Sequence, residues 1–190
     1  MAQILNTMTT TICPATPDEI PAIVDFIIAA RADMFSMLDP SLHLQKAQRE
    51  LASFQQSYLE HPDGAFFTAR VDGRLVATIG YVAYDQRFPQ LDFGHERVVE
   101  VLRMYVHPDW RRIGLASKLF AALEQRARQE GIRRMYLHTH PFLPGSIRFW
   151  ERQGFSIVHI DDDPIWRTTH MSRFLAADEP QQTDLLSTAA

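Results

Sequence analysis

The feature that most constrains the fold is the run from residue 98 to residue 120, VVEVLRMYVHPDWRRIGLASKLF. Its first part, 98–106, is nearly continuous in apolar character, as expected for a central strand buried on both faces. Pro108 ends that strand, and a helix follows as far as Gly131, where a glycine can adopt the left-handed closing conformation. The apolar face of this helix consists of Leu115, Leu119, Ala122, Leu123 and Ala127. The run therefore predicts a buried strand that a tight turn joins to an amphipathic helix.

The start of this helix lacks the usual capping residue. Helices normally begin at Ser, Thr, Asp or Asn, because their first backbone N–H groups have no partner inside the helix. Here Arg111, Arg112 and Gly114 occupy the turn. The helix dipole and the free N–H groups both favour negative charge there. The turn is therefore predicted to bind an anion, although the arginines could also be a solvated pair and Gly114 could simply ease the start of the helix.

The rest of the chain alternates between helical and β-rich segments. Periodicity and turn signals predict an N-terminal strand, helices at 17–35, 42–59 and 146–153, a hairpin about Asp72-Gly73 within 65–84, and strands at 133–140, 155–160 and 165–174. This order indicates a mixed α/β sheet in one domain, residues 9–175. Residues 176–190 are expected to form a flexible tail.

Composition argues against several classes of protein. The formal net charge is −4 and Cys13 is the single cysteine, so there is no global basic field for nucleic acid and no internal disulfide. The longest candidate membrane segment, 22–30, contains Asp25 and is far shorter than the roughly 20 residues that span a bilayer. The N-terminus lacks the basic and apolar regions of a secretory signal. A cytoplasmic protein without membrane or nucleic-acid partners is expected.

Two common phosphate-binding motifs are missing, since neither GxxxxGK[ST] nor a GxGxxG with a following acidic residue occurs. Three other segments carry a resemblance: EVLRMYVHP at 100–108, RRIGLA at 111–116 and SIRFWERQGF at 146–155. Together they resemble the GNAT acetyltransferase superfamily over roughly residues 98–160. The resemblance implies a single-domain α/β (α+β) fold, a mixed and mostly antiparallel twisted sheet of about six or seven strands flanked by about four helices.

The resemblance also implies acetyl-CoA as co-substrate. In the family, the glycine turn has the pattern Q/R-x-x-G-x-G/A, and the backbone amides of this turn hold the pyrophosphate of acetyl-CoA. The resemblance therefore assigns a set of residues to acetyl-CoA binding: Arg111, Arg112, Ile113, Gly114, Leu115, Ala116 and Ser117. By the same resemblance, backbone groups of Met104, Tyr105 and Val106 would pair with the pantetheine arm in the manner of an added strand. Gly114 has no side chain to block a pyrophosphate, and Ala116 is small.

Acetyl transfer to an amine needs a group that takes the amine proton, directly or through water. Glu100 lies within the apolar strand, where desolvation would raise its pKa towards a useful value, and a glutamate at this position often serves as base in the family. Strand alternation places Leu102, Met104 and Val106 on the face of Glu100, and Val101, Arg103 and Tyr105 on the other. Glu100 could instead be solvated or paired with Arg97, and Glu96 is then the reserve base.

The acid that would protonate the leaving thiolate is missing from its usual place. Family members commonly carry a tyrosine in F/L-Y-x-x-x-G-F, where this chain has Trp150, and an indole N–H is not an acid near neutral pH. Leu143 replaces an asparagine often found seven residues earlier. Either the thiolate leaves without a protein acid, or Tyr136, Tyr105 or a water substitutes.

His138 and His140 project to one side of a predicted strand and could suggest a metal pair. A zinc site needs three or four ligands, and no third partner is nearby in sequence. No metal is therefore expected, and His140 would contact the acceptor or be exposed.

The acceptor groove is expected, if the family fold holds, near an apolar group of residues: Met34, Phe35, Met37, Leu38, Phe88 and Phe93. Apolar clusters of this kind are more often core than pocket. Asp33, Asp92 or Glu96 beside aromatic walls would favour a small or peptidyl amine.

The function expected from these observations is N-acetyl transfer from acetyl-CoA to a primary amine of a small molecule or a peptide. A CoA-binding regulatory or sensing protein without turnover is the alternative, and a nucleic-acid-binding module based on the arginines of 103–134 is a third. The final strands could pair across a two-fold axis and form a homodimer.

Overall fold

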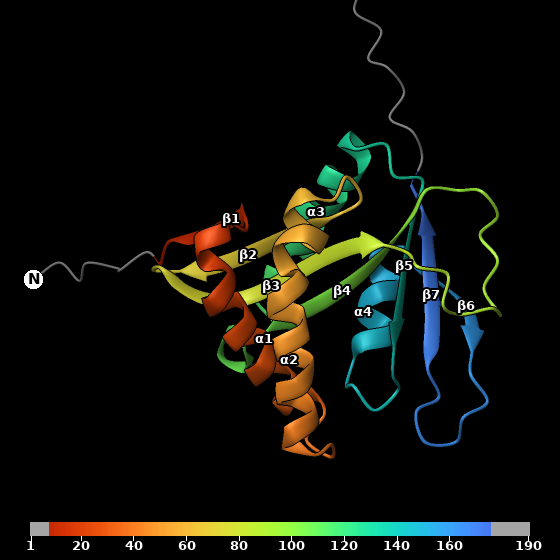
Figure 1. Ribbon diagram of the computed structural model, residues 1–190, viewed down its shortest axis with the longest axis horizontal. Coiled ribbons are helices and arrows are strands. Elements are labelled where there is room, and N and C mark those ends of the chain that lie inside the picture. The colour runs from red at the N-terminus through yellow and green to blue at the C-terminus, as the bar shows by residue number, and fades with distance from the viewer. Residues whose placement is uncertain (1–7, 176–190) are drawn as a thin grey trace, which may run out of the picture.

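The computed structural model describes residues 8–175, apart from the side chains of residues 40, 42, 43, 46 and 47. Within this part, seven strands form one sheet in the order β1-β2-β3-β4-β5-β7-β6, and four α-helices flank it (Figure 1). The strands are β1 (Thr10–Pro14), β2 (Ala65–Val71), β3 (Arg74–Ala83), β4 (Val98–Val106), β5 (Arg134–Thr139), β6 (Ser156–Ile160) and β7 (Thr169–Phe174). The helices are α1 (Ile20–Met34), α2 (Pro40–Phe54), α3 (Leu115–Gln129) and α4 (Ser146–Arg152). Only β4 and β5 pair in parallel, so the expected mixed, mostly antiparallel sheet is confirmed.

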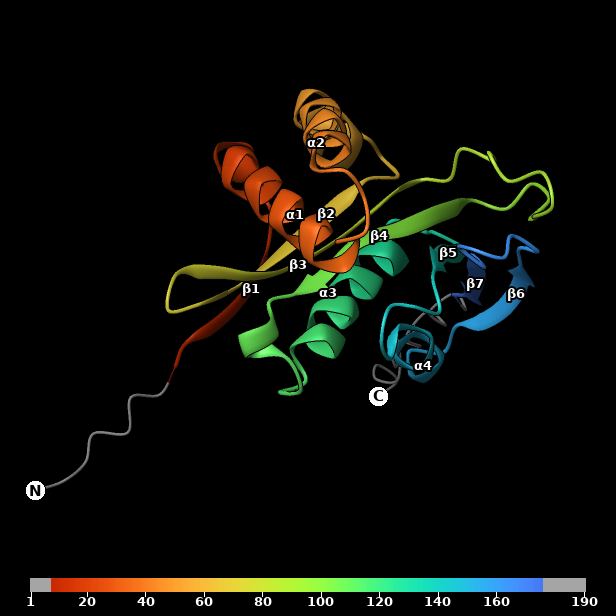
Figure 2. The ribbon, with the colours of Figure 1, turned by 90° about the horizontal axis from the view of Figure 1, so that it is seen from below.

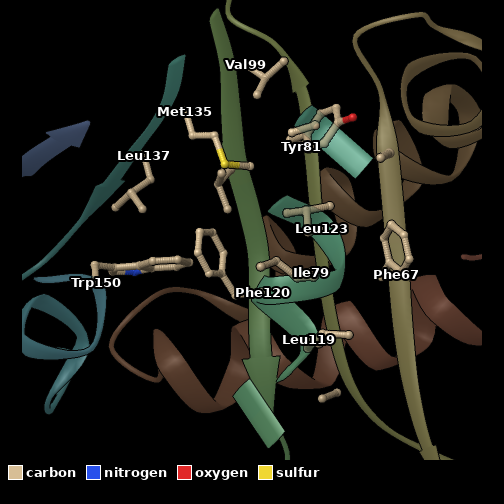
Figure 3. Packing of buried hydrophobic residues seen from close by; sticks show 14 of the residues in the cluster. Phe67, Ile79, Tyr81, Val99, Leu119, Phe120, Leu123, Met135, Leu137 and Trp150 are labelled. Atoms are coloured by element: carbon tan, nitrogen blue, oxygen red, sulfur yellow. The ribbon is translucent and has the colours of Figure 1, made fainter. Parts of the chain in front are cut away.

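The helices cover both faces of the sheet. Helices α1 and α2 lie over one face, and α3 and α4 lie over the other (Figure 2). On the α3 face, Leu119 and Leu123 pack with sheet residues such as Ile79 in the larger of two apolar clusters (Figure 3). On the α1 face, the smaller cluster includes Ile23 and Phe66. No helix of the described residues is both long enough and apolar enough to span a membrane.

Most of the predicted elements are found close to their expected bounds. β4 coincides with the predicted strand, and the hairpin turns at Asp72-Gly73, whose φ angles of 47° and 81° are left-handed. The second helix continues from α2 as a π-helical turn, Gln55–Glu60. The last strand is shorter than predicted, because Asp163 accepts hydrogen bonds from the amides of Ile165 and Trp166 and holds that part in a turn. The predicted tail lies outside the described residues.

Strand β4 contains a β-bulge at Arg103. Thr78 of β3 lies opposite Tyr105, whereas Gly80 lies opposite Leu102, so β4 has one residue more than β3 between these pairs. Arg103 has a φ of 58°, in the left-handed region that a non-glycine residue adopts only when the surroundings hold it there. The Thr78 hydroxyl donates a hydrogen bond of 2.9 Å to the Arg103 carbonyl and stabilises the bulge.

The bulge overturns the predicted alternation along β4. Arg103 was expected on the face opposite Glu100, but its side chain pairs with Glu50 of α2, on the same face as Glu100 and Leu102. Met104 and Val106 pack instead in the cluster on the α3 face. Strict alternation fails because the extra residue shifts the pleat by one position.

The parallel contact between β4 and β5 is short. It consists of three residue pairs, the last of which is Glu100 with Tyr136. β5 continues to Thr139 against β7 on its other side, and β4 continues to Val106 against β3. Beyond Glu100 the two strands therefore part, and the sheet is open at its middle.

Replacing Thr78 by valine tests the role of the hydroxyl in the bulge. Thr78→Val keeps the shape of the side chain but leaves the Arg103 carbonyl without its donor, so we expect the free energy of unfolding to fall by about 1–2 kcal/mol. Urea denaturation measures this loss. Thr68, the cross-strand partner of Thr78 on β2, forms no hydroxyl hydrogen bond within the described residues and gives the matched control, Thr68→Val. Equal losses in the two variants would contradict the assignment.

Candidate active site

A cavity of about 740 Å³ lies where β4 and β5 part. Its walls are residues 101–106 of β4, residues 137–140 at the end of β5, the end of α1 and the segment after it, the start of α3, and the loop and helix from Phe142 to Trp150. It therefore extends from the open middle of the sheet to the turn that precedes α3. The three β4 residues assigned to the pantetheine arm, Met104, Tyr105 and Val106, all line it.

The turn before α3 is fixed to β4 and α1 through Arg111. Its Nε donates a hydrogen bond of 2.8 Å to the Val106 carbonyl, and its Nη2 lies 3.2 Å from Oδ2 of Asp33. The Tyr105 hydroxyl donates to the same carboxylate oxygen at 2.9 Å, and the guanidinium lies 5.4 Å from the Tyr105 ring centre. The side chain of Arg111 thus holds the turn in place, and the Val106 carbonyl is already occupied.

The backbone amides of this turn are free to bind an anion. Arg112 and Gly114 have left-handed φ angles of 65° and 78°, which separates the turn from the helix. The amide of Lys118 makes the first bond of α3, 3.2 Å to the Gly114 carbonyl. Within the described residues, the amides of 112–117 have no hydrogen-bond acceptor, whereas Asp39 caps α2 by accepting from the Ser41 amide. A Cβ placed on Gly114 would meet nothing within 4 Å, so the space beside Gly114 is open.

Glu100 is buried and fully engaged by cations. It has 2% of its surface exposed, accepts two hydrogen bonds of 2.7 and 2.6 Å from the Arg87 guanidinium, and has its Oε1 3.0 Å from Nδ1 of His138. Burial alone would raise the pKa of Glu100. Hydrogen bonding and charge from His138 and Arg87 lower it by more than burial raises it, so the net shift is downwards. The expectation of a raised pKa is therefore wrong, because Arg87 in the loop after β3 neutralises the charge. The suggested pairing with Arg97 is also not found, since Arg97 donates to Asp63 at 2.6 Å.

The other two candidate catalytic residues lie outside the cavity. Glu96 pairs with Arg134 at 2.6 Å on the surface, and Arg134 lowers its pKa. The Tyr136 hydroxyl lies 2.7 Å from Nδ1 of the buried His170, and burial raises the pKa of Tyr136. The structure brings neither residue to the walls of the cavity.

The wall formed by β5 and α4 carries Trp150 where the family tyrosine would stand. Trp150 is buried and packs edge-on against Phe120 at 5.6 Å between ring centres. Beside it, the hydroxyls of Thr139 and Ser146 lie 2.6 Å apart. Tyr105 is the tyrosine that lines the cavity, and burial and Asp33 raise its pKa to about 12.

A second cavity of about 540 Å³ adjoins the first on the α1 and α2 side of β4. The two cavities share four residues, namely Arg31, Leu102, Arg103 and His138. Glu100 and Arg87 line the second cavity. His138 thus stands at the junction, with Nδ1 buried beside Glu100 although the ring is not aligned for a straight hydrogen bond.

Some of the residues expected near the acceptor groove line the two cavities. Met34, Phe35 and Met37 line the first cavity together with Asp33, and Phe88 lines the second. Neither cavity is lined by Leu38, Phe93, Asp92 or Glu96. His140 stacks on Phe142 at 5.0 Å between ring centres, and within the described residues no group of three or more His, Cys, Asp or Glu is placed to hold a metal ion.

Sequence reasoning did not place His138, Arg87 and Arg31 at the walls of these cavities. Of these, only His138 carried a signal, because it lies on the strand next to β4 and its side chain points to one side with that of His140. Arg87 reaches Glu100 of β4 from a loop, and Arg31 reaches the walls of both cavities from α1, and no local pattern marks such positions.

Comparison with known proteins identifies the family. Residues 31–155 match the Acetyltransferase (GNAT) family, and the chain belongs to it. It is 31% identical over 115 residues to the uncharacterized N-acetyltransferase YjgM of Escherichia coli (strain K12), across 60% of this chain and 63% of that protein. It is also similar to the probable N-acetyltransferase camello of Xenopus tropicalis, of which it covers 48%. The chain thus spans less than two thirds of the length of these two curated relatives.

Solved structures show the same fold. A GNAT acetyltransferase from Staphylococcus aureus Mu50 superposes with a TM-score of 0.69 at 19% identity, over 88% of this chain and 100% of that one. The PaiA N-acetyltransferase from Thermoplasma acidophilum, crystallised with coenzyme A, has a TM-score of 0.66 at 14% identity over the same shares of the two chains. At these identities the likeness establishes the fold alone.

Proposed function

We propose that this chain is an N-acetyltransferase that uses acetyl-CoA and acetylates a primary amine. The observation that carries the proposal is the cavity that reaches from the start of α3, where the amides of 112–117 are unbonded, to His138, which has Glu100 beside its Nδ1. Acetyl transfer from acetyl-CoA to an amine requires a site for the cofactor phosphates and a group that takes the amine proton. The unbonded amides would serve the first need, and His138 with Glu100 would serve the second.

Acetyl-CoA supplies the activated acetyl group, and this chain has groups suited to hold it. The amides of 112–117 would bind the pyrophosphate, with Gly114 leaving room for it. The half of β4 beyond Glu100 has lost its partner β5, so its backbone groups would pair with the pantetheine arm as an added strand does.

His138 is the group best placed to take the amine proton. Its imidazole lines both cavities, and the ionised Glu100 beside Nδ1 favours the tautomer with the proton on that nitrogen, which leaves Nε2 as acceptor. Glu100, kept ionised by Arg87, then orients and supports His138 instead of accepting the proton directly. The role of general base, which the sequence suggests for Glu100, would thus be filled by His138 with the support of Glu100.

The leaving thiolate needs little help from the protein. A thiol has a pKa of about 8.5, so the thiolate is a good leaving group near neutral pH. Tyr105 lines the cavity, but its hydroxyl donates to Asp33 and its pKa is raised to about 12. Trp150 in place of a tyrosine is therefore compatible with turnover.

The alternative function is a CoA-binding sensor without turnover. It is favoured by Trp150 and by the firm pairing of Glu100 with Arg87. A nucleic-acid-binding module receives less support, since the arginines of 103–134 are largely paired. Five of them form ion pairs: Arg103 with Glu50, Arg111 with Asp33, Arg126 with Glu130, Arg128 with Glu124 and Arg134 with Glu96.

Filling the turn before α3 tests the cofactor site. Gly114→Trp would place a bulky side chain where the pyrophosphate binds, so we expect calorimetric titration to show acetyl-CoA affinity at least about 100-fold weaker than the micromolar binding expected of the wild type. Gly73→Trp is the matched control, because Gly73 also has a left-handed φ of 81° and open space but lies in the β2–β3 hairpin. No binding to folded wild type, or equal binding to both variants, would contradict the proposal.

Replacing His138 by glutamine separates chemistry from binding. A positioned general base contributes roughly 10²–10⁴-fold, so we expect His138→Gln to lose at least about 100-fold in turnover while its acetyl-CoA affinity stays within a few-fold of wild type. The assay follows CoA thiol release with a panel of amino acids, peptides and polyamines as acceptors. His95→Gln, on the exposed loop before β4, is the control. Turnover by His138→Gln at the wild-type rate would exclude His138 as base, and absence of turnover by a wild type that binds acetyl-CoA would favour the sensor.

A further inference from the structure

Arg31 of α1 is a half-buried cation that has no counter-ion in the part of the chain that the structure describes. Its guanidinium forms no hydrogen bond or ion pair within the described residues, and its Nε is shielded from solvent without a partner. Its one described contact is with the face of Phe35, 5.5 Å from the ring centre. A buried guanidinium nitrogen without an acceptor is costly unless a ligand provides one.

Two of the neighbouring arginines differ from Arg31 in this respect. Arg103 pairs with Glu50, and Arg87 pairs with Glu100. Arg49 also lines the second cavity and, like Arg31, forms no side-chain bond to the described residues. Four guanidinium groups and two carboxylates thus surround this cavity, which is an excess of positive charge in a chain whose formal net charge is −4.

The electrostatic environment of Arg31 favours the arrival of an anion. Burial lowers the pKa of Arg31, and the charge of Arg103 lowers it further, while Glu50 raises it in part. Arg31 is therefore poorly solvated and repelled by a neighbour of like charge. A carboxylate offers a planar pair of oxygens that a guanidinium can bind with two parallel hydrogen bonds.

Arg31 also stands where the reaction would occur. It lines both cavities, as does His138, the proposed base. An anion on Arg31 would thus be a part of the acceptor molecule, beside the group that takes the amine proton. The distant turn at 112–117 has its own unbonded amides for the phosphates.

We propose that the acceptor is an amine that also carries a carboxylate, such as a free amino acid, and that Arg31 binds this carboxylate while the amine faces His138. This inference rests on the proposed acetyltransferase function. In the reaction, the amine nitrogen bonds to the acetyl carbonyl carbon, the carbon–sulfur bond breaks, the amine proton passes to His138 and the sulfur leaves as thiolate with the bonding electrons. The products are an N-acetylated amino carboxylate and CoA. Polyamines, which are cationic throughout, are repelled by the guanidinium cluster.

The test compares free amino acids with their carboxamides, which keep the amine and the side chain but lose the negative charge of the carboxylate. For the wild type we expect kcat/KM for the best free amino acids to exceed that for their amides at least about 100-fold. Arg31→Gln should reduce kcat/KM for the free acids by a similar factor and leave the values for the amides nearly unchanged. Arg74→Gln, on the exposed start of β3, is the control for loss of one positive charge and should behave as wild type.

Several results would overturn the inference. They are equal rates with acids and amides, an acid-to-amide ratio that survives Arg31→Gln, and better turnover of spermidine than of any amino acid. Calorimetry keeps the inference distinguishable from the proposed function. Titration of N-acetyl amino acids and their amides into the CoA-saturated protein should show carboxylate-dependent binding that Arg31→Gln removes. Such binding without turnover would retain the carboxylate site and reject the acetyltransferase function. Turnover only of amines that carry no carboxylate would retain the acetyltransferase function and reject the carboxylate site.

Discussion

The structure depends on the short parallel contact between β4 and β5. After Glu100 and Tyr136 the strands separate, which leaves backbone polar groups in the middle of a sheet without the partners they would normally have. A sheet tolerates this only where another molecule can supply them. The cavity, the position of His138 and the place proposed for the pantetheine arm all follow from this separation. The bulge at Arg103 adds to it, because it directs one more cation to the α1 face.

The distribution of charge around the opening explains its division into two parts. On the α3 side, neutral backbone amides at a helix start would provide the proposed anion site, and Arg111 holds the turn in place. On the α1 and α2 side, guanidinium groups provide the positive charge, and two of them are balanced by Glu50 and Glu100. On the function proposed above, an acidic chain would thus bind anions at two separate places without a basic surface. The two places would select two different molecules, the acyl donor and the acceptor.

The sequence predicted those parts of the fold and site that local patterns specify. The strand 98–106, the hairpin at Asp72-Gly73 and the glycine turn at 114 were found because each is encoded by neighbouring residues. The bulge was missed because its stabilising hydroxyl belongs to Thr78, 25 residues away. The pKa of Glu100 was predicted in the wrong direction for the same kind of reason, since Arg87 reaches it from a loop. Contacts between distant segments set the chemistry of this site, and periodicity does not reveal them.

Hydrogen exchange of the backbone amides in the presence and absence of acetyl-CoA tests the central claim most directly. The amides of 112–117 have no acceptor within the described residues, so they should exchange rapidly in the free protein. Saturation with acetyl-CoA should slow their exchange and that of β4 beyond Glu100, while the turn at Asp72-Gly73 keeps its rate. Rapid exchange of 112–117 in the saturated protein, with protection elsewhere, would contradict the claim that this opening and its turn hold the acyl donor.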